Sequence, residues 1–103
     1  MIVSTPDVQT EPEVEVFNWK IVKLIDKEGN VSEHVTGHEY WDYARVSTAI
    51  VEKGEGYALT TSGRKYILIG KEQRFVTRTA AYVLEGFKRI NELEGVKDEV
   101  SGH

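Results

Sequence analysis

Alternating apolar and polar positions run through the first two thirds of the chain and predict a β-sheet. Residues 14–25 show this alternation and predict one long strand. Residues 26–30 read Asp-Lys-Glu-Gly-Asn, a composition typical of a turn. Residues 31–36 alternate again, so we expect a second strand that pairs back on the first and ends at Gly37.

Three further strands are expected after this pair. Residues 45–52 carry β-branched side chains on both sides and predict a third strand. Residues 57–61 and 65–69 predict a hairpin, because Gly63 between them can adopt the positive φ that a tight turn requires. The consecutive apolar residues 67–69 indicate a strand that is buried on both faces.

The C-terminal third predicts one helix. Thr77 or Thr79 can cap its N-terminus, and we expect it to run to about residue 94, where Gly95 ends it. Gly86 inside this helix costs about 1 kcal/mol relative to alanine and therefore suggests a close backbone approach. Apolar residues recur at spacings of three and four along one face, at Ala80, Val83, Leu84, Phe87 and Ile90.

Together these elements predict an α+β fold, with about five antiparallel strands in a curled sheet or small open barrel followed by one C-terminal helix. At 103 residues the chain is long enough for one domain with its own core. We expect that domain to span residues 14–96, between a flexible acidic arm at residues 1–13 and a flexible polar tail at residues 97–103.

Composition excludes several classes of protein. The chain has no cysteine, which excludes disulfides, thiol catalysis and thiolate metal sites. It has no run of about 18 apolar residues, so we expect no membrane span. Residues 1–12 lack the basic and apolar regions of a signal peptide, and we therefore expect a cytoplasmic location.

Charge is segregated along the chain, although the net charge is only −4. Acidic residues predominate before residue 64 and after residue 89, which favours an acidic face and a basic face with different partners. The bases between these limits are Arg64, Lys65, Lys71, Arg74, Arg78, Lys88 and Arg89.

His34 and His38, with Glu39 and Asp42 nearby, are the candidate metal ligands. A spacing of four would aim both imidazoles at one ion on a helix, but this segment is predicted to be a strand that leads into a loop. Residues four apart in a strand are separated by about 13 Å. We therefore expect hydrogen-bonded or solvent-facing histidines. No glycine-rich loop precedes a helix, so neither a metal nor a cofactor is expected.

Two groups of residues are candidates for contact with a partner. Tyr40, Trp41 and Tyr43 form an aromatic loop that either caps the open end of the barrel or is exposed to bind a protein or stack on bases. Four bases are the second group, which either contacts phosphates or belongs to a solvated surface of mixed charge. These bases are Arg64, Lys65, Arg74 and Arg78.

Three stretches of the chain resemble a set of small uncharacterised bacterial and phage-borne proteins. They are Gly-His at residues 37–38, Val-Ser-Thr-Ala-Ile-Val at residues 46–51, and Thr-Thr-Ser-Gly-Arg-Lys-Tyr-Ile-Leu at residues 60–68. In those proteins a Gly-His pair precedes a strand, and a Thr-x-Ser-Gly-x-x-Tyr-x-Leu hairpin follows. The resemblance implies a shared small β-barrel-like fold and an ancestry in mobile elements, and it implies no catalytic residue.

The expected function is therefore non-enzymatic binding to a protein partner, as a phage or mobile-element accessory that modulates a host protein. Ser62 and its neighbouring threonines have no convincing base, and the turn explains the glycine that follows, so the residues do not support nucleophilic catalysis. The alternative is a nucleic-acid-binding module that uses the basic residues together with Tyr40 and Trp41. Neither pattern indicates the oligomeric state.

Overall fold

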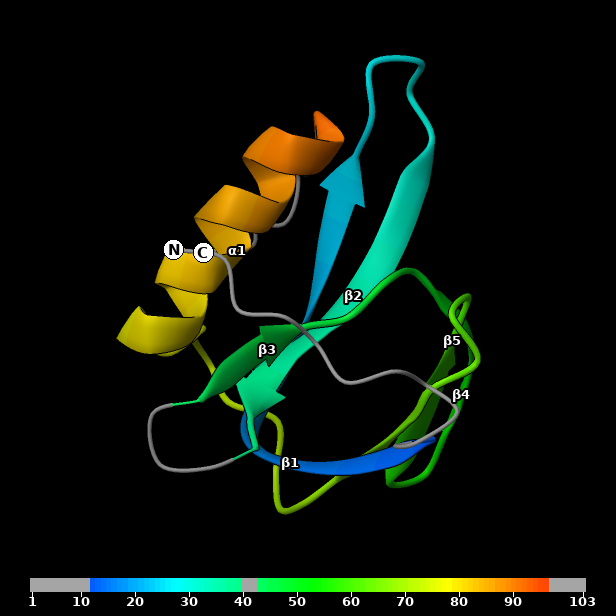
Figure 1. Cartoon of the computed structure of the whole chain (residues 1–103), viewed down its shortest axis with the longest axis vertical. Coiled ribbons are helices and arrows are strands. Elements are labelled where there is room, and N and C mark those ends of the chain that lie inside the picture. The colour runs from blue at the N-terminus through cyan, green and yellow to red at the C-terminus, as the bar shows by residue number, and fades with distance from the viewer. Residues whose placement is uncertain (1–11, 40–42, 97–103) are drawn as a thin grey trace.

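One long bent strand, β1 (Glu13–Ile25), joins the two halves of a curled sheet in the computed structural model, which describes residues 12–39 and 43–96 (Figure 1). The first half of β1 pairs in parallel with β6 (Lys65–Leu68), and the second half pairs antiparallel with β2 (Val31–His38). A β-bulge between Phe17 and Lys20 separates the two halves.

Asn18 is the residue that allows this bend. Its φ of 51° lies in the left-handed region, which asparagine adopts more readily than most residues. The bulge also breaks the alternation of side chains along β1. Val14 and Val16 before it are buried, whereas Trp19 and Ile21 after it are half-buried and pack against the edge of the core.

Six of the seven described strands of the sheet lie in the order β3-β2-β1-β6-β5-β4. The strands not yet given are β3 (Ala44–Val46), β4 (Ile50–Gly54) and β5 (Tyr57–Thr60). A two-residue strand, β7 (Glu94–Gly95), pairs with the end of β1. The sheet curls so that β4 returns toward β2, where Lys53 Nζ lies 3.0 Å from Glu33 Oε1. The α+β fold class is confirmed, with one parallel pairing, β1 with β6, in a mostly antiparallel sheet.

The prediction of a single strand at residues 45–52 is wrong, because residues 47–49 carry the chain from one edge of the sheet to the other. The N–H of Ser47 donates to the carbonyl of Val35 on β2 at 2.9 Å. Two residues later, the carbonyl of Ala49 accepts from the N–H of Thr61 at 2.8 Å, beside β5. The crossing therefore splits the segment into β3 and β4.

Gly37 does not end β2, which continues to His38. Instead, the glycine allows β1 and β2 to approach closely. A Cβ atom at this position would lie 3.2 Å from the Cβ atoms of both Val16 and Trp19, tighter than ordinary van der Waals contact.

The β5–β6 hairpin is confirmed, and Gly63 in its turn has a φ of 91°. The prediction that both faces of β6 are buried is wrong, however, because Ile67 is half-buried and Ile69 is 45% exposed. The inner face of β6 contributes to a core formed by Val14, Val16, Val35, Ala58, Tyr66 and Leu68.

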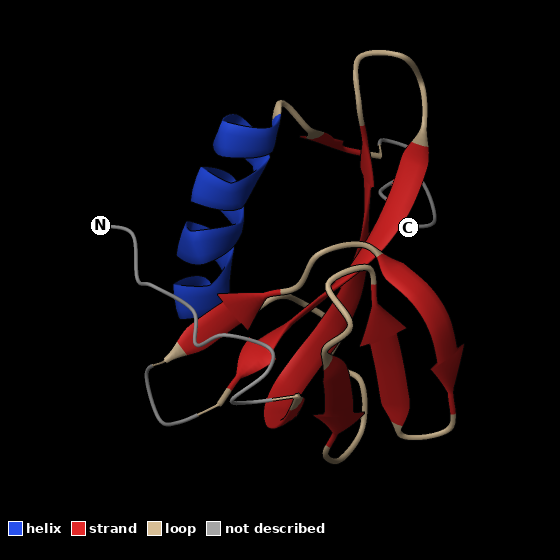
Figure 2. Cartoon of the chain, turned by 45° about the vertical axis from the view of Figure 1, so that its right-hand side comes forward, coloured by secondary structure: helices blue, strands red, loops and turns tan. Residues whose placement is uncertain are grey.

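Helix α1 (Arg78–Asn91) lies on one side of the sheet and packs against β2 and β3 (Figure 2). Thr77 caps its N-terminus as expected. The helix ends earlier than expected because Glu92 adopts a left-handed conformation. Gly95 therefore lies beyond the helix, in β7, where it pairs with Leu24 of β1. Within the described part of the chain, no helix has the length and hydropathy needed to cross a bilayer.

Candidate functional site

A groove of about 570 Å³ runs between α1 and the sheet. One wall is the edge of α1 that carries Tyr82, Gly86 and Ile90, and the other is formed by residues of β3 and of the β5–β6 hairpin. Volumes of this order are typical of sites that hold a ligand or the side chains of a partner.

The helix wall carries large apolar side chains that the sheet leaves exposed. Leu84, on the other edge of α1, is buried against the sheet. Tyr82, Gly86 and Ile90 recur at a spacing of four, so they line one edge of the helix. Tyr82 is 76% exposed and Ile90 is 64% exposed. The apolar surface of α1 is therefore broader than the part that the sheet covers.

Gly86 adds room to this wall. Apart from its chain neighbours and the adjacent helix backbone, no described atom lies within 4 Å of the place where its Cβ would be. The close backbone approach expected from the sequence is therefore not made by another part of the described chain. Gly86 leaves the helix backbone without a side chain between Tyr82 and Ile90, and this stretch lines the groove.

Arg45 on β3 supplies a buried positive charge to the opposite wall. The residue is 5% exposed, and its Nη1 donates to Glu39 Oε1 at 3.0 Å. The guanidinium carbon lies 5.9 Å from the ring centre of Tyr43 and 5.8 Å from that of Tyr66. Packing between two aromatic rings and a carboxylate fixes the position of the guanidinium.

Arg64 lines the same wall from the β5–β6 turn and is 4% exposed. The turn is fixed by Thr60, whose N–H and hydroxyl donate to the Arg64 carbonyl at 3.1 and 3.0 Å. Because both groups of Thr60 hold the Arg64 backbone, the side chain leaves the turn in a defined direction.

The charged residues that line the groove are Arg45, Arg64, Arg89 and Glu85. The carboxylate of Glu85 is 2.8 Å from Lys88 Nζ, one turn along the helix. Arginine therefore dominates the charge of the groove. The site combines a helix wall, where Tyr82 and Ile90 stand beside Glu85 and Arg89, with a sheet wall that carries Arg45 and Arg64.

His34 and His38 form internal hydrogen bonds. The two ring nitrogens of His34 lie 2.7 Å from Ser32 Oγ and 2.9 Å from the Ser47 carbonyl, and its ring meets the edge of Phe87. His38 Nε2 lies 2.5 Å from Thr77 Oγ1. Among residues 12–39 and 43–96, no three side chains of the metal-binding types gather into a site. Neither Ser32 nor His34 lines the groove.

Of the aromatic residues expected to bind a partner, Tyr43 lines the groove, and Tyr40 and Trp41 lie outside the described residues. Of the basic residues, Arg64 lines the groove and the other three do not. Arg78 is the first residue of α1, and Arg74 lies over the ring of Phe75.

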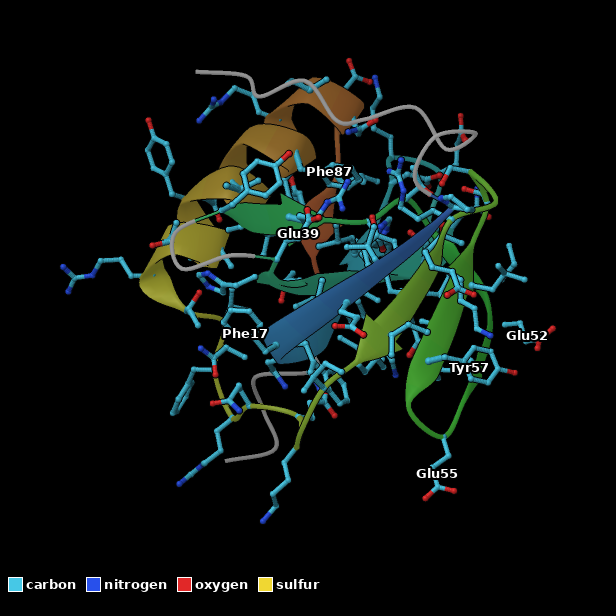
Figure 3. All side chains as sticks on the ribbon, turned by 60° about the horizontal axis from the view of Figure 1, so that its bottom comes forward. Phe17, Glu39, Glu52, Glu55, Tyr57 and Phe87 are labelled. Atoms are coloured by element: carbon cyan, nitrogen blue, oxygen red, sulfur yellow. The ribbon has the colours of Figure 1, made fainter. Side chains whose placement is uncertain are left out.

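Lys65 points to a different part of the molecule, with its Nζ 5.0 Å from the ring centre of Tyr57. Figure 3 shows Tyr57 and Glu52 on the β4–β5 hairpin, away from Phe87 and Glu39. The hydroxyl of Tyr57 donates to Glu52 Oε2 at 2.6 Å, which raises the pKa of Tyr57. The four expected bases therefore do not share one surface.

Sequence reasoning missed Arg45, Tyr66 and Tyr82 as site residues. The spacing of four between Tyr82 and Gly86 places an aromatic beside a glycine on one helix edge, and this signal was available. Nothing in the local pattern around Arg45 distinguishes it from a solvated strand residue.

Comparison of the chain with protein-family models, with curated proteins and with solved structures found no match.

Proposed function

We propose that this protein is a non-enzymatic protein-binding module, and that the groove between α1 and the sheet receives a segment of its partner. The observation that carries the proposal is the uncovered apolar edge of α1, with Tyr82 and Ile90 facing a wall that contains Arg45 and Arg64. Tyrosine and arginine are enriched at the energetic centres of protein interfaces, where apolar surface is buried beside a few oriented polar groups.

The resemblance of residues 60–68 to phage-borne proteins supports a more specific role. We therefore propose that the partner is a host protein whose activity is modulated when the groove is filled.

Protein binding is favoured over nucleic-acid binding by the placement of the bases. Arg64 lies almost buried in the groove, whereas Lys65 lies over Tyr57 on the hairpin. Phosphate contacts require several exposed bases along one face, and the chain has a net charge of −4 that repels a polyanion.

Site-specific cross-linking tests this proposal. A photo-reactive benzoylphenylalanine replaces either Tyr82 in the groove or Phe75 outside it, two aromatic residues with almost equal exposure of 76% and 74%. The proposal predicts a nuclease-resistant protein adduct from position 82 and none from position 75. The adduct should disappear in Gly86→Phe, which fills the groove and replaces glycine by a better helix former. Adducts with nucleic acid at position 82, or equal protein adducts at both positions, would refute it.

A further inference from the structure

We propose that two copies of this chain pair through α1, with the helices antiparallel and crossing at Gly86, and that this pairing covers the helix wall of the groove. The surface is the exposed edge of α1 that carries Tyr82, Gly86 and Ile90. The dimer goes beyond the proposed function. Its consequence for regulation rests on that function, because the edge that pairs is also the edge that a partner would contact.

The exposed edge of α1 is symmetric about Gly86. Tyr82 lies four residues before this glycine and Ile90 lies four residues after it, and both side chains are large and mostly exposed. A two-fold axis at Gly86 that reverses the direction of the helix places Tyr82 of each copy beside Ile90 of the other. The edge is therefore complementary to itself, which is the property that a symmetric dimer requires.

Gly86 allows the two helices to approach closely at the two-fold axis. Only its chain neighbours and the adjacent helix backbone lie within 4 Å of the place where a Cβ would be, among the described atoms. Side chains spaced by four residues form ridges that fit between those of a second helix. A residue without a side chain at the crossing point removes the obstacle there, and this contact is a use for a glycine that costs the helix stability.

The charges beside this edge favour an antiparallel second copy. Glu85 and Arg89 are spaced by four residues, so they lie on one flank of the edge, and both are exposed. The two-fold axis at Gly86 brings this flank against the same flank of the second copy in the opposite direction. With a rise of about 1.5 Å per residue, Arg89 of one copy then stands about 3 Å along the helix from the level of Glu85 of the other. Two such pairs of opposite charge form, one on each side of the axis.

These pairs use charges that remain accessible in the single chain. Glu85 Oε2 lies 2.8 Å from Lys88 Nζ, but the Glu85 side chain is 60% exposed, and a carboxylate accepts several hydrogen bonds. Arg45 and Arg64, which are buried in the sheet wall, take no part. Because Glu85 and Arg89 cancel, they add nothing to the net charge of −4 that would make two copies repel each other.

Pairing of this kind would regulate the groove by concentration. A second copy covers Tyr82 and Ile90, which are the side chains that the proposed function assigns to the partner. The dimer and the complex with a partner therefore exclude each other, and by mass action the partner binds the monomer.

A charge-swap pair of variants tests the inference with the full chain alone, by sedimentation equilibrium from about 1 μM to about 1 mM. We expect the unmodified chain to pass from monomer to dimer in this range. Arg89→Glu leaves an acid at both positions and Glu85→Arg leaves a base at both, so each variant should dimerise about tenfold or more weakly. An equimolar mixture should form a heterodimer, since every acid then faces a base. Lys71→Glu, at an exposed base outside the groove, is the control and should dimerise like the unmodified chain.

Circular dichroism checks that the variants are folded, and Gly86→Lys is a second test, because it places a long side chain and two like charges at the two-fold axis. A chain that stays monomeric throughout would overturn the inference. So would a dimer that survives Gly86→Lys or either charge variant undiminished, or a mixture of folded variants that forms no heterodimer. These outcomes leave the proposed function to the cross-linking experiment, because an adduct between two copies has twice the mass of the chain and is distinguished from an adduct with another protein.

Discussion

The hydroxyl of Thr77, which caps α1, lies 2.5 Å from Nε2 of His38, which is buried at the end of β2. The same hydroxyl accepts a hydrogen bond from the N–H of Ala80 at 3.2 Å. His38 in turn stacks on Phe17 of β1. The Thr77 side chain therefore caps the helix and also links it to the sheet through His38. This link helps to position the helix wall of the groove.

Thr77→Ala should lower the free energy of unfolding by about 1–2 kcal/mol, because it removes both the cap and the partner of His38. Thr79→Ala is the matched control, since Thr79 is exposed in the first turn and should change stability much less. Urea denaturation of the two variants measures the difference. Equal losses, or no loss in Thr77→Ala, would contradict the dual role of this hydroxyl.

Leu68→Ala should destabilise the fold by about 2–5 kcal/mol, because Leu68 lies in the core on the inner face of β6 and its removal leaves a cavity. Ile69→Ala, the next residue along, removes a side chain that is partly in solvent and should cost clearly less. Thermal unfolding followed by circular dichroism compares them. A larger loss of stability in Ile69→Ala would show that Ile69, and not Leu68, points into the core.

Asp26 gives the turn between β1 and β2 a predictable response to acid. Its carboxylate accepts from the N–H groups of Asn30 and Glu28 at 2.8 and 2.9 Å, and these bonds lower the pKa of Asp26. Because the pKa is lower in the folded state than in the unfolded state, the turn is stabilised above the unfolded pKa. That stabilisation is lost as the pH falls through the folded pKa.

The carboxyl carbon of Asp26 can be followed by NMR through an acid titration of the folded chain. Its midpoint should lie below that of the same aspartate in a synthetic peptide of residues 23–33, which lacks the sheet. A midpoint equal to or above the peptide value would contradict the hydrogen bonding seen in the turn.

Several elements could be predicted because their signals are local, although the division of residues 45–52 into β3 and β4 and the short strand β7 were not. Alternation marked β1 and β2, Gly63 marked the hairpin, and Thr77 marked the start of α1. The parallel pairing of β1 with β6 and the crossing at residues 47–49 could not be predicted in this way. Both depend on contacts between segments far apart in the chain, and the bulge at Asn18 that makes them possible leaves no periodic signal.

The candidate site could be predicted only in part for a similar reason. Tyr43 and Arg64 were expected to contact a partner, and both line the groove. The sequence grouped Arg64 with Lys65, but adjacent residues entering a strand point to opposite faces, so the two bases separate. Arg45 reaches the same wall from β3 through the register of β3 with β2, a feature that appears only when the sheet is assembled.

The most direct test of whether the groove is the binding site uses the partner captured through position 82. Its affinity is measured for the Tyr82→Ala and Phe75→Ala variants. Both variants remove an exposed aromatic side chain, so neither should unfold the protein, and circular dichroism verifies this. Tyr82→Ala should weaken binding by about tenfold or more, equivalent to about 1.4 kcal/mol, while Phe75→Ala leaves the affinity unchanged. An unchanged affinity in Tyr82→Ala, with a loss in Phe75→Ala, would contradict the assignment of the groove as the binding site.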